Sequence, residues 1–215
     1  VGPPYFTAVF LVPVLPLLAL LGIGMHAAWK RARLAALQRP LSIALGVALL
    51  IALLLAAVLY GQAKTLTVVG LTAGLWLIYS SLREPISRLR HRQTLSAAVL
   101  GMSIAHLGVA SMVIGVTTVE SFKIEKDLAM KPGDSATVGG YTFKFVSERS
   151  LSGPNYSAVE GEFAITRGDT AVAVLHPQKR VYRVQTSPMT EAGISVGWTR
   201  DLFVALGDQL GGGAW

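Results

Sequence analysis

Long apolar runs fill the first half of the chain, and short alternating runs fill the second. Crossing about 30 Å of hydrocarbon takes roughly 20 mainly apolar residues in a helix. Four stretches approach that length, at about 6–24, 40–60, 66–82 and 96–119. We predict four transmembrane helices. Pro13 and Pro16 predict a kink in the first, whereas Pro40 is expected in the first turn of the second, where its missing N–H costs nothing.

From Glu120 onward, apolar and polar residues alternate over short runs bounded by turn residues, a pattern typical of strands and hairpins. Gly139-Gly140 separates the runs 136–138 and 141–148. Two adjacent glycines can supply both positive φ angles of a tight turn, so these runs predict a β-hairpin.

A second hairpin is predicted from the runs 163–167 and 170–175, which flank the turn Gly168-Asp169. Gly153-Pro154-Asn155 predicts a loop, and 181–185 predicts one more strand. Five or six strands in this half favour a small β-sandwich or barrel. The predicted fold class is therefore a polytopic α-helical membrane segment, 1–119, followed by a small all-β domain, 120–215.

The chain is basic, with a formal charge of +7, and 52% of its residues are hydrophobic. Residues 1–119 hold nine Lys and Arg and a single acid, Glu84, whereas residues 120–215 hold ten bases and eleven acids. Because the basic excess lies entirely in the apolar half, it is better explained by loop charges that orient helices than by a nucleic-acid surface. We therefore expect no nucleic-acid partner.

Basic residues gather in two loops of the predicted bundle: Lys30, Arg31, Arg33 and Arg39 in one, and Arg83, Arg88, Arg90 and Arg92 in the other. Both loops are expected to face the cytoplasm. The N-terminus and the β-domain then lie outside it. Val1 has neither a start methionine nor a signal-peptide n-region, so we expect a piece of a longer polytopic chain.

No cysteine occurs, which excludes thiol chemistry and disulfides from this segment. Four histidines remain as candidates for metal binding or proton transfer. His26 has the position of an interfacial anchor, His91 lies between two arginines, and His176 precedes a proline at a strand end. Ordinary surface roles explain these three best.

His106 differs because it lies about ten residues, or roughly 15 Å, into the fourth predicted span. Ionisable groups at that depth are functional candidates. By helical periodicity its face also holds Val99, Met102, Ser103, Val109, Ala110 and Val113. Gly101, Gly108 and Gly115 fall on the opposite face, where we expect another helix to pack. Haem ligation and a structural hydrogen bond both remain open for this imidazole.

Seven short segments resemble, in order, the C-terminal region of the CcmF and NrfE family of cytochrome c haem lyases. They are Gly2-Pro-Pro-Tyr-Phe6, Ala105-His-Leu-Gly-Val109, Met130-Lys-Pro-Gly-Asp134, Gly140-Tyr-Thr-Phe143, Gly153-Pro-Asn-Tyr156, His176-Pro-Gln-Lys-Arg180 and Met189-Thr-Glu-Ala192. The resemblance implies a bacterial inner-membrane protein with a periplasmic β-domain. It also implies the attachment of haem to Cys-x-x-Cys-His motifs of exported apocytochrome c.

In that family a transmembrane b-haem is held by two histidines from different helices. The resemblance places one axial ligand at His106, and the other would lie upstream of Val1. It further implies that haem arrives from the chaperone CcmE, that CcmH/CcmI-type partners supply apocytochrome, and that quinol could serve as reductant.

The family's tryptophan-rich external segment has no counterpart here, because Trp29, Trp76, Trp198 and Trp215 are scattered singly. We therefore expect no catalysis from this segment alone and identify no catalytic residue. A structural membrane anchor that presents an external β-domain for partner docking is the main alternative. A transporter ranks third, since polar midplane groups are few.

Overall fold

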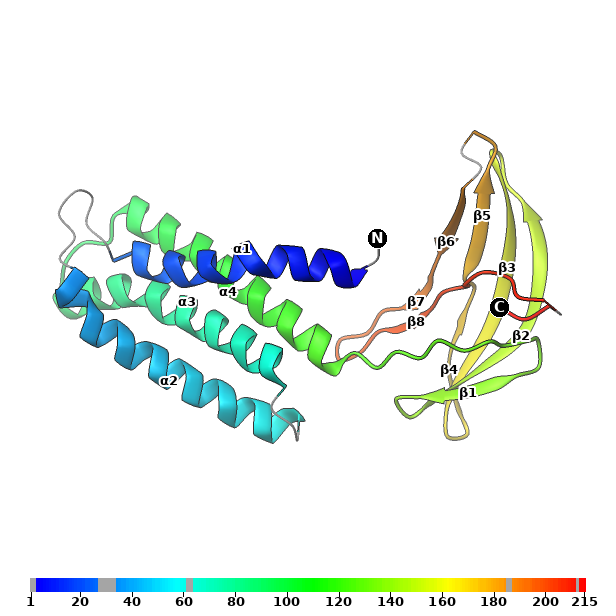
Figure 1. Ribbon diagram of the computed structural model, residues 1–215, viewed down its shortest axis with the longest axis horizontal. Coiled ribbons are helices and arrows are strands. Elements are labelled where there is room, and N and C mark those ends of the chain that lie inside the picture. Colours follow the sequence, from blue (N-terminus) through cyan, green and yellow to red (C-terminus); the bar gives the residue numbers. More distant parts are fainter. Residues whose placement is uncertain (1–2, 27–33, 61–63, 185–186, 212) are drawn as a thin grey trace. The chain divides into compact units, whose positions relative to one another are not determined.

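A computed structural model of the chain describes residues 3–26, 34–60, 64–184, 187–211 and 213–215. The molecule divides into two compact units, Val1–Lys123 and Ile124–Trp215. The first is helical and the second is built of strands (Figure 1). Each unit is described by itself.

The helical unit consists of α1 (Pro3–Gly24), α2 (Leu34–Tyr60), α3 (Thr65–Arg90) and α4 (Ala97–Phe122). Among the described residues, three helical stretches are long and apolar enough to cross a membrane: Leu37–Leu59, Thr65–Arg90 and Ala97–Phe122. The apolar stretch of α1, Val9–Gly24, is shorter. A helical membrane segment is thus confirmed, while the count of four spans stays a prediction.

Two helices extend beyond the apolar spans predicted for them. Helix α2 begins at Leu34, which puts Pro40 inside the helix rather than in its first turn. Helix α3 continues past Leu82 to Arg90 and contains Pro85. Polar residues end the membrane-compatible stretch, but they do not stop helical hydrogen bonding.

The extension of α3 changes the second basic loop of the prediction. Arg83, Arg88 and Arg90 are helical, and the Nε of Arg88 pairs with the Oε1 of Glu84 one turn earlier at 2.7 Å. Of the first basic loop, Lys30, Arg31 and Arg33 lie outside the described residues.

Helix α3 packs against the other three helices (Figure 1). Its Trp76 and Leu77 form a buried cluster with side chains of α1, α2 and α4. Two glycines of α3 allow α4 to approach closely: a Cβ at Gly70 would overlap the Thr117 side chain, and one at Gly74 would overlap Ile114. Small residues therefore set the distance between these helices, as is common in membrane bundles.

The helix expected to pack on the glycines of α4 is not among the described residues. A Cβ at Gly101, Gly108 or Gly115 would meet nothing within 4 Å. The buried residues of α4, Ser103 and Ala110, lie instead on the face that also carries His106. Helix α3 covers that face because its own glycines provide the close approach, so α4 needs none there.

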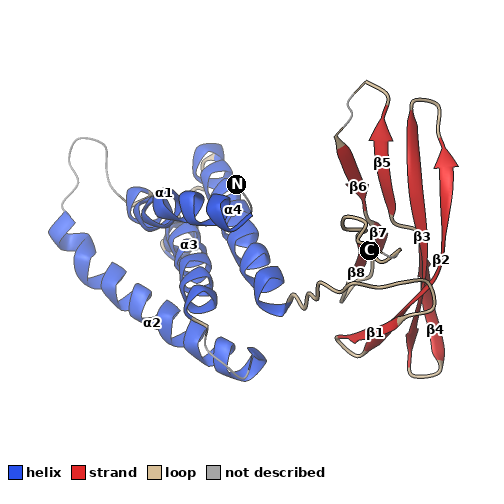
Figure 2. Ribbon diagram, turned by 45° about the vertical axis from the view of Figure 1, so that its right-hand side comes forward, coloured by secondary structure: helices blue, strands red, loops and turns tan. Residues whose placement is uncertain are grey.

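The described residues of the β unit form eight strands: β1 (Ser135–Val138), β2 (Tyr141–Ser152), β3 (Tyr156–Arg167), β4 (Thr170–Leu175), β5 (Gln178–Tyr182), β6 (Pro188–Glu191), β7 (Gly193–Ser195) and β8 (Leu202–Val204). Six form an antiparallel sheet in the order β1-β2-β3-β5-β6, with β4 also paired to β3, and β7 and β8 form a second sheet (Figure 2). The all-β prediction is confirmed.

Both predicted hairpins are present, with positive φ at Gly139 (57°), Gly140 (81°) and Gly168 (56°). The loop predicted at 153–155 joins two strands of 12 residues each, longer than expected. The strand expected at 181–185 is instead Gln178–Tyr182, and Gln185 lies outside the described residues. Its polar sequence shows no alternation, so pairing with β3 rather than local pattern defines it.

The core of the β unit is aromatic. The rings of Phe145 and Phe163 stack with centroids 4.5 Å apart and planes within 7°. They are packed with Ile165, Leu175, Leu202 and Leu206. The C-terminal segment closes this core, because Trp215 exchanges two backbone hydrogen bonds with Met130, at 2.9 and 3.0 Å.

Candidate functional site

His106 is half-buried on α4, and its ring has a defined orientation. The imidazole Nδ1 lies 2.7 Å from the backbone oxygen of Met102, one turn earlier. A carbonyl oxygen can only accept a hydrogen bond, so Nδ1 carries the hydrogen. The neutral ring therefore keeps its lone pair on Nε2, which has no protein partner among the described residues.

The antiparallel register of α3 and α4 identifies what lies across from His106. The hydroxyls of Thr67 and Ser121 are 2.8 Å apart, and Gly70 lies against Thr117. Continued along both helices, the same register brings His106 to the level of Ser81. The Ser81 hydroxyl is fully buried and donates to the carbonyl of Leu77 at 2.6 Å.

Two further hydroxyls near this level are buried without a hydrogen-bond partner in the described part of the chain. They belong to Ser80 and Ser103, which are 1% and 3% exposed. By contrast, the hydroxyls of Thr117 and Thr118 each donate to the carbonyl four residues earlier. Near His106 the α3–α4 interface therefore holds two unsatisfied hydroxyls beside the satisfied Ser81, whereas the hydroxyls near Thr117 are satisfied.

The other three histidines do not join His106. His26 follows α1, and its Nε2 is buried without a partner in the described residues, unlike the interfacial anchor expected there. His91 is the exposed C-cap of α3. His176 belongs to the β unit, where its Nδ1 lies 3.8 Å from an oxygen of Glu160.

No group of three or more His, Cys, Asp or Glu residues that could hold a metal ion occurs in the described part of the chain. His106 therefore offers one ligand atom, Nε2, rather than a metal site of its own. A bare ion needs several such ligands. A planar cofactor that supplies four equatorial ligands needs only one or two axial ligands from protein.

The β unit contains a polar network that the sequence did not predict. Glu160 is 6% exposed and accepts hydrogen bonds from the Nε and Nη2 of Arg149, at 2.9 and 2.6 Å, and from the side-chain amide of Gln178 at 2.5 Å. Burial by itself raises the pKa of Glu160, but the hydrogen bonds and the charge of Arg149 outweigh it, and the pKa is lowered.

Three of the segments quoted above meet in this network. Arg180 stacks over the Tyr156 ring, with its guanidinium 4.6 Å from the centroid, and its Nε donates to the Gln178 side chain at 2.8 Å. Its Nη1 pairs with Glu191 on β6 at 3.4 Å. In the sequence these segments are linked only by the family resemblance, whereas in the structure they are joined by pairing across β3, β5 and β6.

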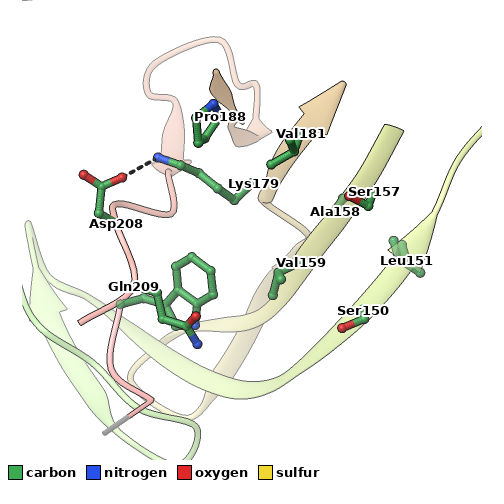
Figure 3. Close-up of a pocket in the computed structure, with 11 residues that line it drawn as sticks. Ser150, Leu151, Ser157, Ala158, Val159, Lys179, Val181, Pro188, Asp208 and Gln209 are labelled. Atoms are coloured by element: carbon green, nitrogen blue, oxygen red, sulfur yellow. Dashed lines mark hydrogen bonds and ion pairs between the residues drawn. The ribbon is translucent and has the colours of Figure 1, made fainter. Parts of the chain in front are cut away.

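A cavity of about 410 Å³ opens on the other face of the same strands (Figure 3). Val159 and Val181 give it an apolar wall, and Lys179 reaches across it to pair with Asp208 at 3.1 Å. Trp215 also lines it. The ion pair joins the sheet to the C-terminal segment. The cavity therefore lies between the sheet and that segment and is part of their packing.

Comparison with known proteins gives consistent matches. Residues 121–215 match a family model described as the CcmF C-terminal beta-sandwich. The whole chain is 37% identical to cytochrome c-type biogenesis protein CcmF of Pseudomonas aeruginosa and 34% identical to CcmF of Escherichia coli, covering 34% and 33% of those proteins. NrfE of Haemophilus influenzae is 30% identical over 99% of the chain.

A solved structure, titled Cytochrome c Heme Lyase CcmF, superposes with a TM-score of 0.66 at 22% identity, over 92% of this chain and 33% of that one. At that identity the likeness establishes the fold. The chain spans about a third of the length of the curated relatives it matches.

Proposed function

This chain belongs to the CcmF family of cytochrome c-type biogenesis proteins, and we propose that it is the C-terminal part of a haem lyase component in which His106 is an axial ligand of a transmembrane b-haem. The whole protein would take haem from the chaperone CcmE and attach it to exported apocytochrome c. The names of the relatives and of the solved structure support the general activity.

The 2.7 Å contact between the Nδ1 of His106 and the carbonyl oxygen of Met102 is the single observation that carries the ligand assignment. Iron binds a neutral imidazole through an unprotonated nitrogen, and the Met102 carbonyl leaves that nitrogen at Nε2. A hydrogen bond at the opposite ring nitrogen is also the usual support for a metal-bound histidine, since it fixes the ring and raises its basicity. The residues present therefore fit a haem ligand.

The surroundings of His106 also suit a large apolar group. Met102 and Val113 are partly exposed beside it on α4, and Val109 is 36% exposed. These side chains would offer apolar contacts to the bound group. When bound, a b-haem supplies one-electron transfer, with quinol as the proposed reductant. The role of His106 is to hold the iron and set its ligand field, and the role of Met102 is to orient the ring.

The location follows from the same proposal. The three membrane-compatible helices support a multi-pass membrane protein. We propose the bacterial inner membrane, with the basic ends of α2 and α3 in the cytoplasm and the β unit in the periplasm. There the β unit would meet CcmE, CcmH/CcmI-type partners and apocytochrome c.

The test is the optical spectrum of the purified full-length protein with His106→Ala. We expect the b-type haem band to disappear while the protein remains in the membrane at normal abundance. His91→Ala, which changes an exposed histidine of the same unit, is the matched control and keeps the band. An unchanged band in His106→Ala would refute the ligand role and favour a membrane anchor that presents the β unit.

A further inference from the structure

The turn between β7 and β8 exposes an unusual amount of apolar surface. Trp198 at its tip is fully exposed, at 106% of the reference area, and Val196 is 80% exposed. Behind the tip, Ile194 and Phe203 are directly paired across the two strands and are 54% and 59% exposed. Four large apolar side chains thus share one short hairpin.

This exposure is not a sign of a loose segment, because both ends of the hairpin are fixed. Next to the turn, Leu202 pairs with Ser195, is 5% exposed and belongs to the aromatic core of the β unit. A Cβ at Gly193 would press against Leu175 and the backbone of Pro177, so β7 runs close to the main sheet there. Within the turn, the N–H of Gly197 donates to Asp201 at 2.9 Å.

Positive charge lies next to the hairpin. The guanidinium groups of Arg200 and Arg167 lie 5.3 and 5.5 Å from the centroid of the same ring, Tyr141, and the Nε of Arg200 donates to its hydroxyl at 3.2 Å. In the described part of the chain, neither arginine forms an ion pair with a carboxylate. An apolar tip therefore lies near two arginines, Arg200 in the turn and Arg167 on β3, and the turn also carries the carboxylate of Asp201.

We propose that the β7–β8 tip is a bilayer anchor, in which Trp198 and Val196 enter the interfacial layer of the membrane and Arg200 binds lipid phosphates. Tryptophan is enriched at membrane interfaces because its ring is apolar and its N–H is polar. Arginine forms strong charge-assisted hydrogen bonds with phosphate. The combination fits a phospholipid surface better than a purely apolar protein groove.

The covalent connection of the two units keeps the β unit close to a phospholipid bilayer. The candidate span Ala97–Phe122 ends two residues before Ile124, where the β unit begins. A domain tethered so closely to a membrane helix stays at a high local concentration relative to the lipid surface. The modest affinity of one tryptophan and one valine is then sufficient, and the anchor works on whichever side of the membrane the β unit lies.

The test places a single cysteine at Val196 or at Val184 and labels it with an environment-sensitive fluorophore. Val184 is the matched control, because it is also a valine, is 100% exposed and lies on a different turn of the same unit. The full-length protein, on a background without other cysteines, is reconstituted into phosphatidylethanolamine/phosphatidylglycerol liposomes with and without a lipid-borne spin-label quencher.

We expect the label at Val196→Cys to be blue-shifted and quenched several-fold more strongly than the label at Val184→Cys. Adding Trp198→Asp to Val196→Cys should lower quenching to the control level, and since Trp198 makes no buried contact this change leaves the fold intact. Equal quenching at both sites would overturn the proposal. A blue shift without lipid quenching would also overturn it, because protein rather than lipid would then cover the tip.

Discussion

Glu160 in the β unit and His106 in the helical unit are both polar groups removed from water, but their partners differ. Glu160 accepts three hydrogen bonds from Arg149 and Gln178 and has His176 at 3.8 Å. His106 has one hydrogen bond, to a carbonyl of its own helix. Both carboxylate oxygens of Glu160 thus have partners within the described residues, whereas the Nε2 of His106 has none.

Under the proposed function, this difference separates a structural polar group, Glu160, from a ligand, His106. A buried carboxylate is tolerated only when its lone pairs are satisfied, and Glu160 meets that condition by cross-strand pairing. An imidazole whose Nε2 lone pair has no protein partner in the described residues is prepared for a ligand from elsewhere. The comparison predicts that removing Glu160 lowers the stability of the β unit, whereas removing His106 abolishes haem binding in the full-length protein.

The largest expected effect concerns haem in the full-length protein. His106→Gly removes the ligand and leaves space for free imidazole, so we expect the b-type band to be lost and then restored when imidazole is added. Absorbance titration with imidazole measures the recovery. Failure of imidazole to restore any band, in a protein that retains normal abundance, would show that His106 has a structural role instead.

The next effect concerns the helical unit, where Gly74 and Gly108 form a matched pair. Gly74→Leu would overlap Ile114 and should cost about 1–3 kcal/mol of stability. A Cβ at Gly108 meets nothing within 4 Å in the described residues, so Gly108→Leu should cost little by itself. Thermal unfolding in detergent compares the two. A larger loss in Gly108→Leu than in Gly74→Leu would mean that a segment outside this chain packs on the glycine face of α4.

In the β unit, Glu160→Gln should cost about 1–3 kcal/mol, because the amide keeps a single acceptor oxygen and turns a donor toward either Arg149 or Gln178, and the charge that pairs with Arg149 is lost. Hydrogen exchange along β3 and β5 measures the loss. Glu162→Gln, on the same strand but without the paired arginine, is the control. Combining Glu160→Gln with Arg149→Gln should cost less than the sum of the single changes, since both remove one interaction. An additive result would contradict the network.

The smallest effect is the pH dependence of the same network. The pKa of Glu160 is lowered in the folded state, so its contribution to stability is present above the ordinary value of 4.5 and is lost as the pH falls through the lowered value. Unfolding measured from neutral pH to below 4.5 should therefore show a steeper acid loss in the natural sequence than in Glu160→Gln. Equal slopes would assign the acid response to other carboxyl groups.

Local sequence pattern was sufficient for much of this fold. Apolar length located the helical segment, and Gly139-Gly140 and Gly168 located two hairpins, because each of these features acts within a few residues. The depth of His106 within α4 also followed from counting along one helix. The same local reasoning placed the end of α3 at Leu82, although the helix continues to Arg90.

What only the tertiary structure decided depends on distant partners. Helical periodicity put His106 and the α4 glycines on opposite faces, but it could not say which face α3 would cover, since that choice depends on Gly70 and Gly74 on another helix. The network around Glu160 joins β2, β3, β5 and β6, and each of its members looks like an ordinary surface residue in the sequence. Periodicity specifies which residues share a face, whereas packing between elements decides what that face meets, because the partners are set by the shapes and hydrogen-bonding groups of remote residues.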